Sequence, residues 1–235
     1  MKLVPPELDV LVIAPHPDDA ELGMGGSILR FLEEGKRVGI LDLTDGEPTP
    51  YGTVETRALE TAEATRILGI SWRGNLGLPN RSLQATLEAR KALASIIRLC
   101  RAPWLFAPYW LDAHPDHMAA TQLVEEARFW AKLSKTDMAG EPFHPNRIYH
   151  YYCVHLKHAV QPAFILDISE HFDRKMLAVN SFESQFITGR STNPPTFLDR
   201  VTSNAEYCGQ LIGVRYGEAF QCKEPIGINS MDCLI

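Results

Sequence analysis

Two short clusters of histidine and aspartate could carry chemistry in this 235-residue chain. The first occupies residues 16–21 and the second residues 112–117, and each contains a His-Pro-Asp core. Imidazole and carboxylate are the ligands that zinc takes when no thiolate is offered, and catalytic zinc usually has three protein ligands and a position for water. The sequence therefore predicts one zinc ion per chain, bound by His16, Asp19 and His117.

The remaining side chains of the two clusters match the needs of hydrolysis. Zinc lowers the pKa of a bound water from about 15.7 towards about 7, and a free carboxylate beside it can take the proton. Asp18 is left free for this role as general base. His114 would then donate to the developing oxyanion, and Asp116 would orient His114.

Other interpretations of these residues are open. A single histidine or aspartate at a strand end is usually a turn or helix-cap residue, but two such clusters are hard to explain by capping. Two histidines and one carboxylate also form the site of non-haem iron oxygenases, although the spare Asp18 favours hydrolysis. A protein that only binds metal is the non-enzymatic alternative. Glu21 would either hydrogen-bond a metal ligand or stabilise the first turn of a helix.

The elements before the two clusters explain how they could meet. Residues 10–14 form a continuous apolar run, typical of a strand buried on both faces, and lead directly into the first cluster. A second strand, over residues 103–108, precedes the second cluster. Ligands bind beyond the carboxyl ends of the strands in a parallel sheet, so both clusters should lie at one edge.

Alternating strand and helix patterns predict an α/β fold: a single Rossmann-like three-layer domain over residues 1–235, with a mostly parallel sheet. The other expected strands cover 37–43, 70–73, 147–154 and 163–168. The expected helices cover 27–34, 54–68, 84–101, 116–132, 170–182 and 196–213.

Three glycines, Gly23, Gly25 and Gly26, raise the alternative of a dinucleotide-binding Rossmann protein, with Asp42 as its ribose contact. The fingerprint fails because the third glycine of its pattern would have to stand where the chain has Ile28. Two aspartates also occupy the turn where a pyrophosphate needs bare backbone N–H groups.

The composition bounds the function further. The net charge of −6 gives no reason to bind nucleic acid, and no apolar run approaches the roughly 20 residues of a membrane span. Residues 1–7 do not resemble a signal peptide, so we expect a cytoplasmic location. The five cysteines are odd in number and lack a CxxC pair, which predicts reduced thiols.

The segment 14–23, together with His-Pro-Asp-His at 114–117, resembles the LmbE/PIG-L family of zinc de-N-acetylases. Further segments carry the same resemblance over nearly the whole chain, namely 42–47, 75–79, 107–110, 183–186 and 213–218. These outer segments look most like the bacillithiol-biosynthesis branch, which removes acetate from N-acetylglucosaminyl-malate. Pro15 departs from the family pattern, which has alanine at this position.

By this resemblance His16, Asp19 and His117 match the zinc ligands, Asp18 the general base, and the histidine and aspartate at 114 and 116 the oxyanion donor and its orienting acid. Arg57 matches an arginine that reaches the substrate, although an exposed helix arginine paired with a glutamate is the structural alternative. The resemblance implies an N-acetylated sugar as substrate and an enzyme that is often a homo-oligomer. The metal motif does not identify the aglycone.

Overall fold

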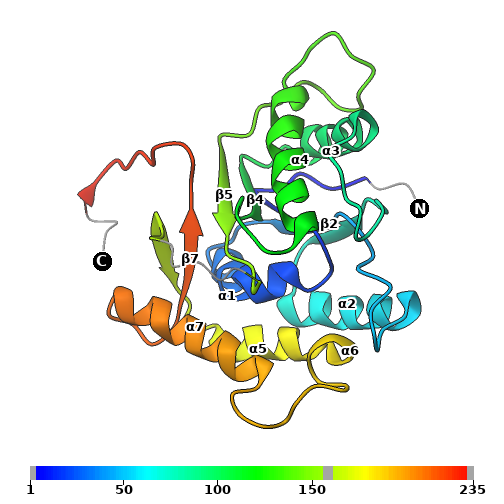
Figure 1. The fold of residues 1–235 in the computed structure, drawn as a ribbon. Helices are drawn as coiled ribbons and strands as arrows, with labels where there is room; N and C mark the ends of the chain where they lie inside the picture. The colour runs from blue at the N-terminus through cyan, green and yellow to red at the C-terminus, as the bar shows by residue number, and fades with distance from the viewer. Residues whose placement is uncertain (1–3, 156–160, 232–235) are drawn as a thin grey trace.

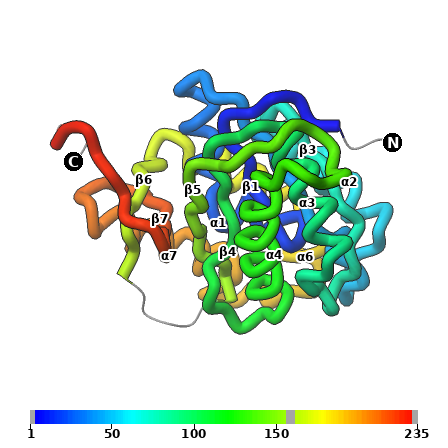
Figure 2. The backbone as a smooth tube through the Cα atoms, turned by 90° about the horizontal axis from the view of Figure 1, so that it is seen from above, coloured from blue at the N-terminus to red at the C-terminus, as the bar shows by residue number. Residues whose placement is uncertain are grey.

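The computed structural model describes residues 4–155 and 161–231, and a single seven-stranded sheet runs through them (Figure 1). The strand order is β3-β2-β1-β4-β5-β7-β6, and Figure 2 shows the strands side by side. The strands are β1 (Val10–Ala14), β2 (Val38–Asp42), β3 (Trp72–Asn75), β4 (Trp104–Pro108), β5 (Arg147–Tyr151), β6 (Phe164–Asp167) and β7 (Gly217–Gln221). The pairs β5–β7 and β7–β6 are antiparallel and the other four pairs of described strands are parallel, so the sheet is mostly parallel, as predicted.

Helices cover both faces of the sheet and make the three layers expected of the fold class. They are α1 (Asp19–Glu33), α2 (Val54–Leu68), α3 (Leu87–Cys100), α4 (Pro115–Ala131), α5 (Phe172–Asn180), α6 (Glu183–Phe186) and α7 (Phe197–Leu211). Helices α3 and α4 pack together on one face, and α1, α2 and α5 pack together on the other (Figure 1). The predicted Rossmann-like α/β fold is confirmed.

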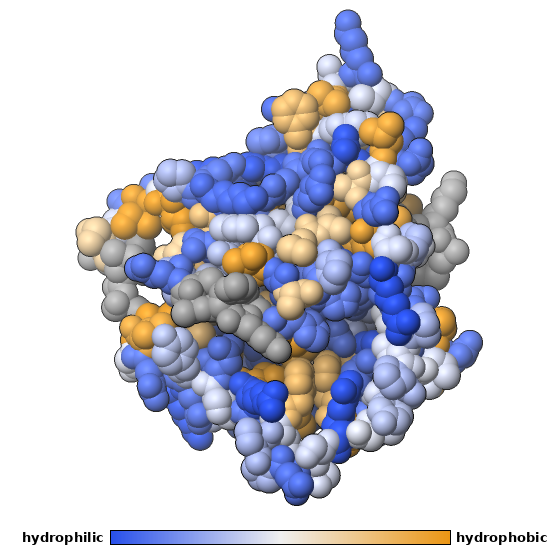
Figure 3. All heavy atoms as spheres, in the orientation of Figure 1, coloured by the Kyte–Doolittle hydropathy of each residue, from blue (hydrophilic) through white to orange (hydrophobic). Residues whose placement is uncertain are grey.

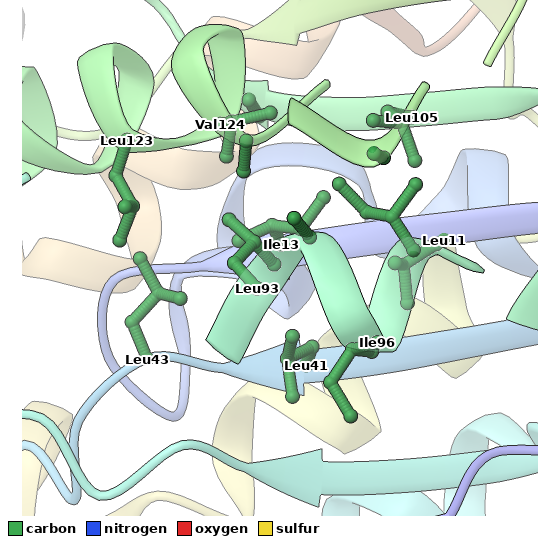
Figure 4. Close-up of a cluster of buried hydrophobic side chains, with 14 of the residues drawn as sticks. Leu11, Ile13, Leu41, Leu43, Leu93, Ile96, Leu105, Leu123 and Val124 are labelled. Carbon is green, nitrogen blue, oxygen red and sulfur yellow. The ribbon is translucent and has the colours of Figure 1, made fainter. Parts of the chain in front are cut away.

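The core lies on both faces of the central strands, because their side chains alternate between two apolar layers. Leu11 and Ile13 of β1 point towards α3 and α4, where they meet Leu93 and Leu123 (Figure 4). The alternate β1 residues, such as Val12, join the layer beneath α1. This double burial explains the continuous apolar run at 10–14.

The first helix differs from its prediction. The sequence predicts a helix over 27–34, whereas α1 begins at Asp19 and includes the three glycines. Glycine is a poor helix former, but here it allows close packing. A Cβ on Gly23 would lie 2.4 Å from the ring of Tyr151, and an isoleucine side chain leaves as little room at Gly26. Packing therefore accounts for these glycines without a bound pyrophosphate.

Other differences concern short or irregular elements. β3 begins two residues later than predicted, at Trp72, and α3 begins at Leu87 instead of residue 84. Neither α6 nor β7 was expected: α6 is a single turn, and β7 carries too few apolar residues to stand out by pattern.

No helix among the residues that the structure describes is long and apolar enough to cross a membrane. Four of the cysteines are described and are free thiols, while Cys233 lies outside the described residues.

Candidate metal centre

The two polar clusters meet at the carboxyl ends of β1 and β4. β1 pairs with β2 on one side and β4 on the other, so the strand order reverses here, which is where open α/β sheets bind ligands. A cavity of about 350 Å³ opens at this point, lined by residues of both clusters and by Arg57. This volume suits a small molecule.

The donors of His16, Asp19 and His117 converge, and all three residues are buried. Asp19 Oδ2 lies 3.0 Å from His16 Nδ1 and 3.3 Å from His117 Nε2. Tetrahedral zinc with bonds of about 2.0–2.1 Å places its ligand atoms about 3.3 Å apart. The donor set therefore fits a zinc ion in both chemistry and spacing.

The second nitrogen of each histidine faces a further carboxylate. His117 Nδ1 lies 3.3 Å from Asp112 Oδ2, and His16 Nε2 lies 3.4 Å from Asp116 Oδ2. Such outer carboxylates fix the orientation of ligating imidazoles and raise their basicity. No role at the metal was predicted for Asp112 from the sequence, although its place in the second cluster was the available signal.

Two other donor groups also have their atoms within 4.8 Å of one another, but each contains a donor that is less available to an ion. One combines Asp112, His117 and Cys153, and the other combines His16, His114 and Asp116. Burial raises the pKa of the Cys153 thiol to about 12, so this residue offers a protonated sulfur. In the second group both carboxylate oxygens of Asp116 already accept from backbone N–H groups, those of Arg81 and Leu83.

The charges of the three predicted ligands depend on one another. Burial alone would raise the pKa of Asp19, but the charge and hydrogen bonds of His117 and His16 hold that pKa well below its usual range. Burial alone would lower the pKa of His117, but Asp19 and Asp112 raise it well above the ordinary histidine value. The ionised Asp19 carboxylate thus contacts the rings of both His16 and His117. Protons on these rings and a bound cation would compete for the same lone pairs of Asp19.

Asp18 stands beside these ligands in a conformation that L residues rarely adopt. Its φ of 131° lies outside the allowed regions for non-glycine residues, and such strain persists where the surroundings impose it, often at functional sites. The Arg57 Nη1 donates to Asp18 Oδ2 at 2.8 Å and to the Pro17 carbonyl at 2.7 Å. Burial raises the pKa of Asp18 to about 7, and the charge of Arg57 opposes this shift.

Arg57 is therefore tied to the protein, and it differs from an exposed helix arginine. Only 3% of it is exposed, and its Nε donates to Glu47 Oε1 at 3.2 Å. Glu47 also accepts from the backbone N–H of Thr49 at 2.6 Å, so it connects Arg57 to the loop that precedes α2. No role was predicted for Glu47 from the sequence, because this contact depends on how α2 crosses the first cluster.

His114 lines the cavity next to the ligands, but its partner differs from the one expected. Its Nδ1 accepts from the backbone N–H of Asp116 at 3.2 Å, while the Asp116 carboxylate accepts from the backbone N–H groups of Arg81 at 2.7 Å and Leu83 at 3.2 Å. The carboxylate faces His16 and makes no described hydrogen bond to the His114 ring. Burial and the charges of His117 and His16 lower the pKa of His114. A neutral ring that accepts at Nδ1 carries its hydrogen on Nε2, so it can still donate.

The sequence matches the PIG-L family, described as GlcNAc-PI de-N-acetylases, over residues 11–128, which include both clusters. The chain belongs to this family. A diacetylchitobiose deacetylase of Thermococcus kodakarensis is 32% identical over 230 residues, covering 90% of this chain and 82% of the relative. The crystal structure of the conserved protein TT1542 from Thermus thermophilus superposes with a TM-score of 0.86 at 42% identity, covering 94% of this chain and 97% of that one.

Membership in the PIG-L family identifies the chain as a deacetylase that hydrolyses N-acetyl amide bonds. This membership excludes the two alternatives left open by the sequence, a dinucleotide-binding protein and a non-haem iron oxygenase. A probable N-acetyl-α-D-glucosaminyl L-malate deacetylase of Bacillus anthracis is also similar, at 26% identity over 86% of this chain and 92% of the relative. The chain is thus more similar in sequence to the diacetylchitobiose deacetylase, at 32% identity, than to this relative of the bacillithiol branch, at 26%.

Proposed function

We propose that this protein is a zinc-dependent N-deacetylase of a small molecule that contains N-acetylglucosamine, releasing acetate and a free amine. The observation that carries the proposal is the convergence of His16, Asp19 and His117 donors within 4.8 Å of one another, with the Asp18 carboxylate lining the same cavity. The relatives support the substrate class, because the two deacetylases named above act on diacetylchitobiose and on N-acetyl-α-D-glucosaminyl L-malate.

Each remaining side chain has a defined task. A zinc ion at the three donors would acidify a water molecule and polarise the acetamide carbonyl. Asp18 accepts the proton of the attacking water and later returns it to the leaving nitrogen. Arg57 holds Asp18 in place through its 2.8 Å contact and favours the ionised carboxylate. His114 donates through Nε2 to the oxyanion that forms on the acyl oxygen.

The cavity limits what binds. Its volume of about 350 Å³ has room for one amino-sugar ring beside the donors. Gln185 Nε2 donates to Thr49 and Ser184, so the amide oxygen of Gln185 is left to accept from a sugar hydroxyl. The acetamide must face the His16–Asp19–His117 group, so the rest of the ring lies against the other walls of the cavity. Residues near the metal thus contact the sugar ring, and residues farther away contact the aglycone.

The decisive experiment combines metal exchange with a substrate panel. Chelator-treated protein is reloaded with Zn²⁺ or Fe²⁺ and incubated with methyl N-acetylglucosaminide, diacetylchitobiose and N-acetylglucosaminyl-malate, while released amine and acetate are quantified. We expect one zinc per chain, activity only after reloading, and circular dichroism unchanged by chelation because the apolar core does not depend on the ion. Activity with Fe²⁺ and none with Zn²⁺ would overturn the metal assignment, and no release from any substrate would overturn the reaction.

A further inference from the structure

Helix α1 is interrupted at Met24, shortly after the proposed metal ligand Asp19. Met24 has a φ of −152° and a ψ of 26°, which are not helical values, so α1 consists of a first segment, residues 19–23, and a second segment, residues 25–33. Kinks of this kind occur at glycine and serine pairs or where a side chain enters the hydrogen-bond ladder. Both causes are present, because residues 25–27 are Gly-Gly-Ser and a carboxylate bonds to their backbone.

Glu218 of β7 closes the beginning of the second segment. Its Oε1 accepts from the backbone N–H of Gly26 at 3.0 Å, and its Oε2 accepts from the backbone N–H and the hydroxyl of Ser27 at 2.7 and 2.6 Å. In an uninterrupted helix these two N–H groups would donate to the carbonyls of residues 22 and 23. The carboxylate supplies the acceptors that the break removes, and it interacts favourably with the positive end of the helix dipole.

Lys175 of α5 closes the end of the first segment. Its Nζ donates to the Leu22 carbonyl at 2.8 Å and to Glu218 Oε1 at 2.5 Å. Cations near the last carbonyls of a helix satisfy these acceptors and interact favourably with the negative end of the dipole. Each helix end at the break therefore meets the charge that it favours, and the two charges neutralise each other.

The ion pair lies in the interior. Helix α5 runs through the lower half of the face drawn in Figures 1 and 3, where the surface is mostly hydrophilic with a short apolar strip. Lys175 and Glu218 do not contribute to that surface, because they are only 3% and 4% exposed. A buried ion pair is weak evidence for stability, since the loss of water offsets the attraction of the charges. The specific contacts of this pair are the two helix ends at the break.

The glycines allow these side chains to approach the backbone. A Cβ on Gly25 would lie 3.1 Å from Cγ of Lys175, and a Cβ on Gly26 would lie 2.7 Å from Cβ of Ile168, in the connection between β6 and α5. Larger residues would push α5 and this connection away from the break. The Gly-x-Gly-Gly pattern at 23–26 thus fits a helix break that is held from outside.

We propose that Lys175 and Glu218 are positioning residues for Asp19: they hold the break, and the break gives the first segment the orientation that brings Asp19 to the two histidines. The inference rests on the proposed zinc site. A single helical turn has too few internal hydrogen bonds to hold itself, so its orientation depends on partners at its two ends. At one end the His16 N–H donates to Asp19 Oδ2 at 3.1 Å, and at the other Lys175 binds the Leu22 carbonyl.

The test measures the Kd for Zn²⁺ of chelator-treated protein by competition with a chromogenic chelator. Lys175→Met/Glu218→Gln removes both caps without changing the net charge, and its Kd should be at least about tenfold higher, the usual cost of losing an outer partner at a metal site. Arg98→Met is the matched control, because Arg98 is also 3% exposed and donates to a helix-end carbonyl, that of Ala131, at 2.9 Å. It should leave the Kd unchanged. An unchanged Kd in the double variant, or an equal rise in the control, would overturn the inference.

Amide hydrogen exchange in the metal-free protein tests the caps directly. The N–H groups of Gly26 and Ser27, and that of Leu22, which donates to the Asp18 carbonyl at 2.9 Å, should exchange faster in the double variant than in Arg98→Met. If the wild-type chain binds zinc but deacetylates no substrate, the proposed reaction falls and the Kd comparison still decides the inference. If it binds no zinc, the proposed site falls, and unchanged exchange at Leu22 overturns the hold on the first segment, whereas faster exchange supports it.

Ser27→Ala is the second variant, for the case that the double variant does not fold. It removes only the hydroxyl contact with Glu218, and alanine is a good helix former, so the fold should persist. We expect a smaller rise of the zinc Kd, together with faster exchange at Gly26. If both quantities equal those of the wild type, the contacts of Glu218 at the break do not position Asp19 and the inference is wrong.

Discussion

Arg57 and Arg98 are both helix arginines with 3% exposure, yet their surroundings differ in kind. Arg57 contacts two carboxylates, Asp18 at 2.8 Å and Glu47 at 3.2 Å. Arg98 donates to backbone carbonyls of the segment that begins at the end of α4, including Ala131 at 2.9 Å, and contacts no carboxylate among the described residues. The acceptors of a buried arginine, more than its burial, indicate what it does.

The difference follows from what each region must hold. Arg98 lies near the end of α3, which packs against α4, and the carbonyls at the end of α4 carry partial negative charge that its guanidinium can neutralise while it fixes the loop between α4 and β5. Arg57 instead compensates the buried Asp18 carboxylate, which under the proposed function has to be ionised to act as a base. Arg98 thus holds backbone in place, whereas Arg57 holds the carboxylate of the proposed base.

The largest effect should come from the carboxylate that Arg57 supports. Asp18→Asn removes the base but keeps the size of the side chain, so kcat should fall by about 10²- to 10⁴-fold while zinc content stays near one per chain. Asp19→Ala removes a ligand, so zinc should be lost along with activity. Zinc analysis and kcat of both variants check the assignment.

The opposite pattern is informative. If Asp18→Asn lost the metal and Asp19→Ala retained it, the roles of the two adjacent aspartates would be exchanged, and Arg57 would support a ligand instead of a base.

His114 offers the next largest effect at the same site. His114→Ala removes the Nε2 donor, and kcat should fall by about 10²- to 10³-fold with little change in zinc affinity. His114→Gln, which keeps a donor, should recover part of the loss. An unchanged kcat in the alanine variant would reduce His114 to a helix cap, the role that its contact with the Asp116 N–H also allows.

Replacing Arg57 tests its role as a positioning residue. Arg57→Met should lower kcat by about 10- to 100-fold, the usual cost of losing an outer partner at a metal site. Arg57→Lys keeps the charge and should restore part of the rate, which a purely steric role would not explain. If KM rises with kcat unchanged, Arg57 contacts the substrate directly, as the family resemblance implied.

The parts of the site that adjoin a buried strand in sequence could be predicted. The cluster at 16–21 follows β1 directly, and 112–117 follows β4 within a few residues, so strand pattern and residue type were sufficient. Asp112 and Glu47 received no role because their contacts with His117 and Arg57 depend on ring orientation and helix crossing, which no local pattern encodes.

The fold shows the same division. Strongly periodic or continuous apolar segments such as β1 and α4 were predicted within a few residues, whereas the start of α1 was missed because tertiary packing overrides the low helix propensity of its glycines. β7 was missed because its five residues include too few apolar side chains to show a strand pattern.

Arg98 should complete the comparison with an effect on stability alone. Arg98→Met keeps the apolar part of the side chain but leaves the carbonyls of Ala131 and of the loop after α4 without their donor, which should cost about 1–3 kcal/mol of unfolding free energy. For a chain of this size each kcal/mol lowers Tm by about 2–4 °C. The kcat of the folded fraction should not change, because the contacts of Arg98 are backbone carbonyls outside the cavity at the proposed metal site. Arg66→Met, at a 71% exposed helix arginine paired with Glu63, is the control and should leave both quantities unaltered. Urea unfolding and kcat measured on the same samples decide the matter: a fall in kcat at unchanged stability would show that Arg98, like Arg57, acts on the site.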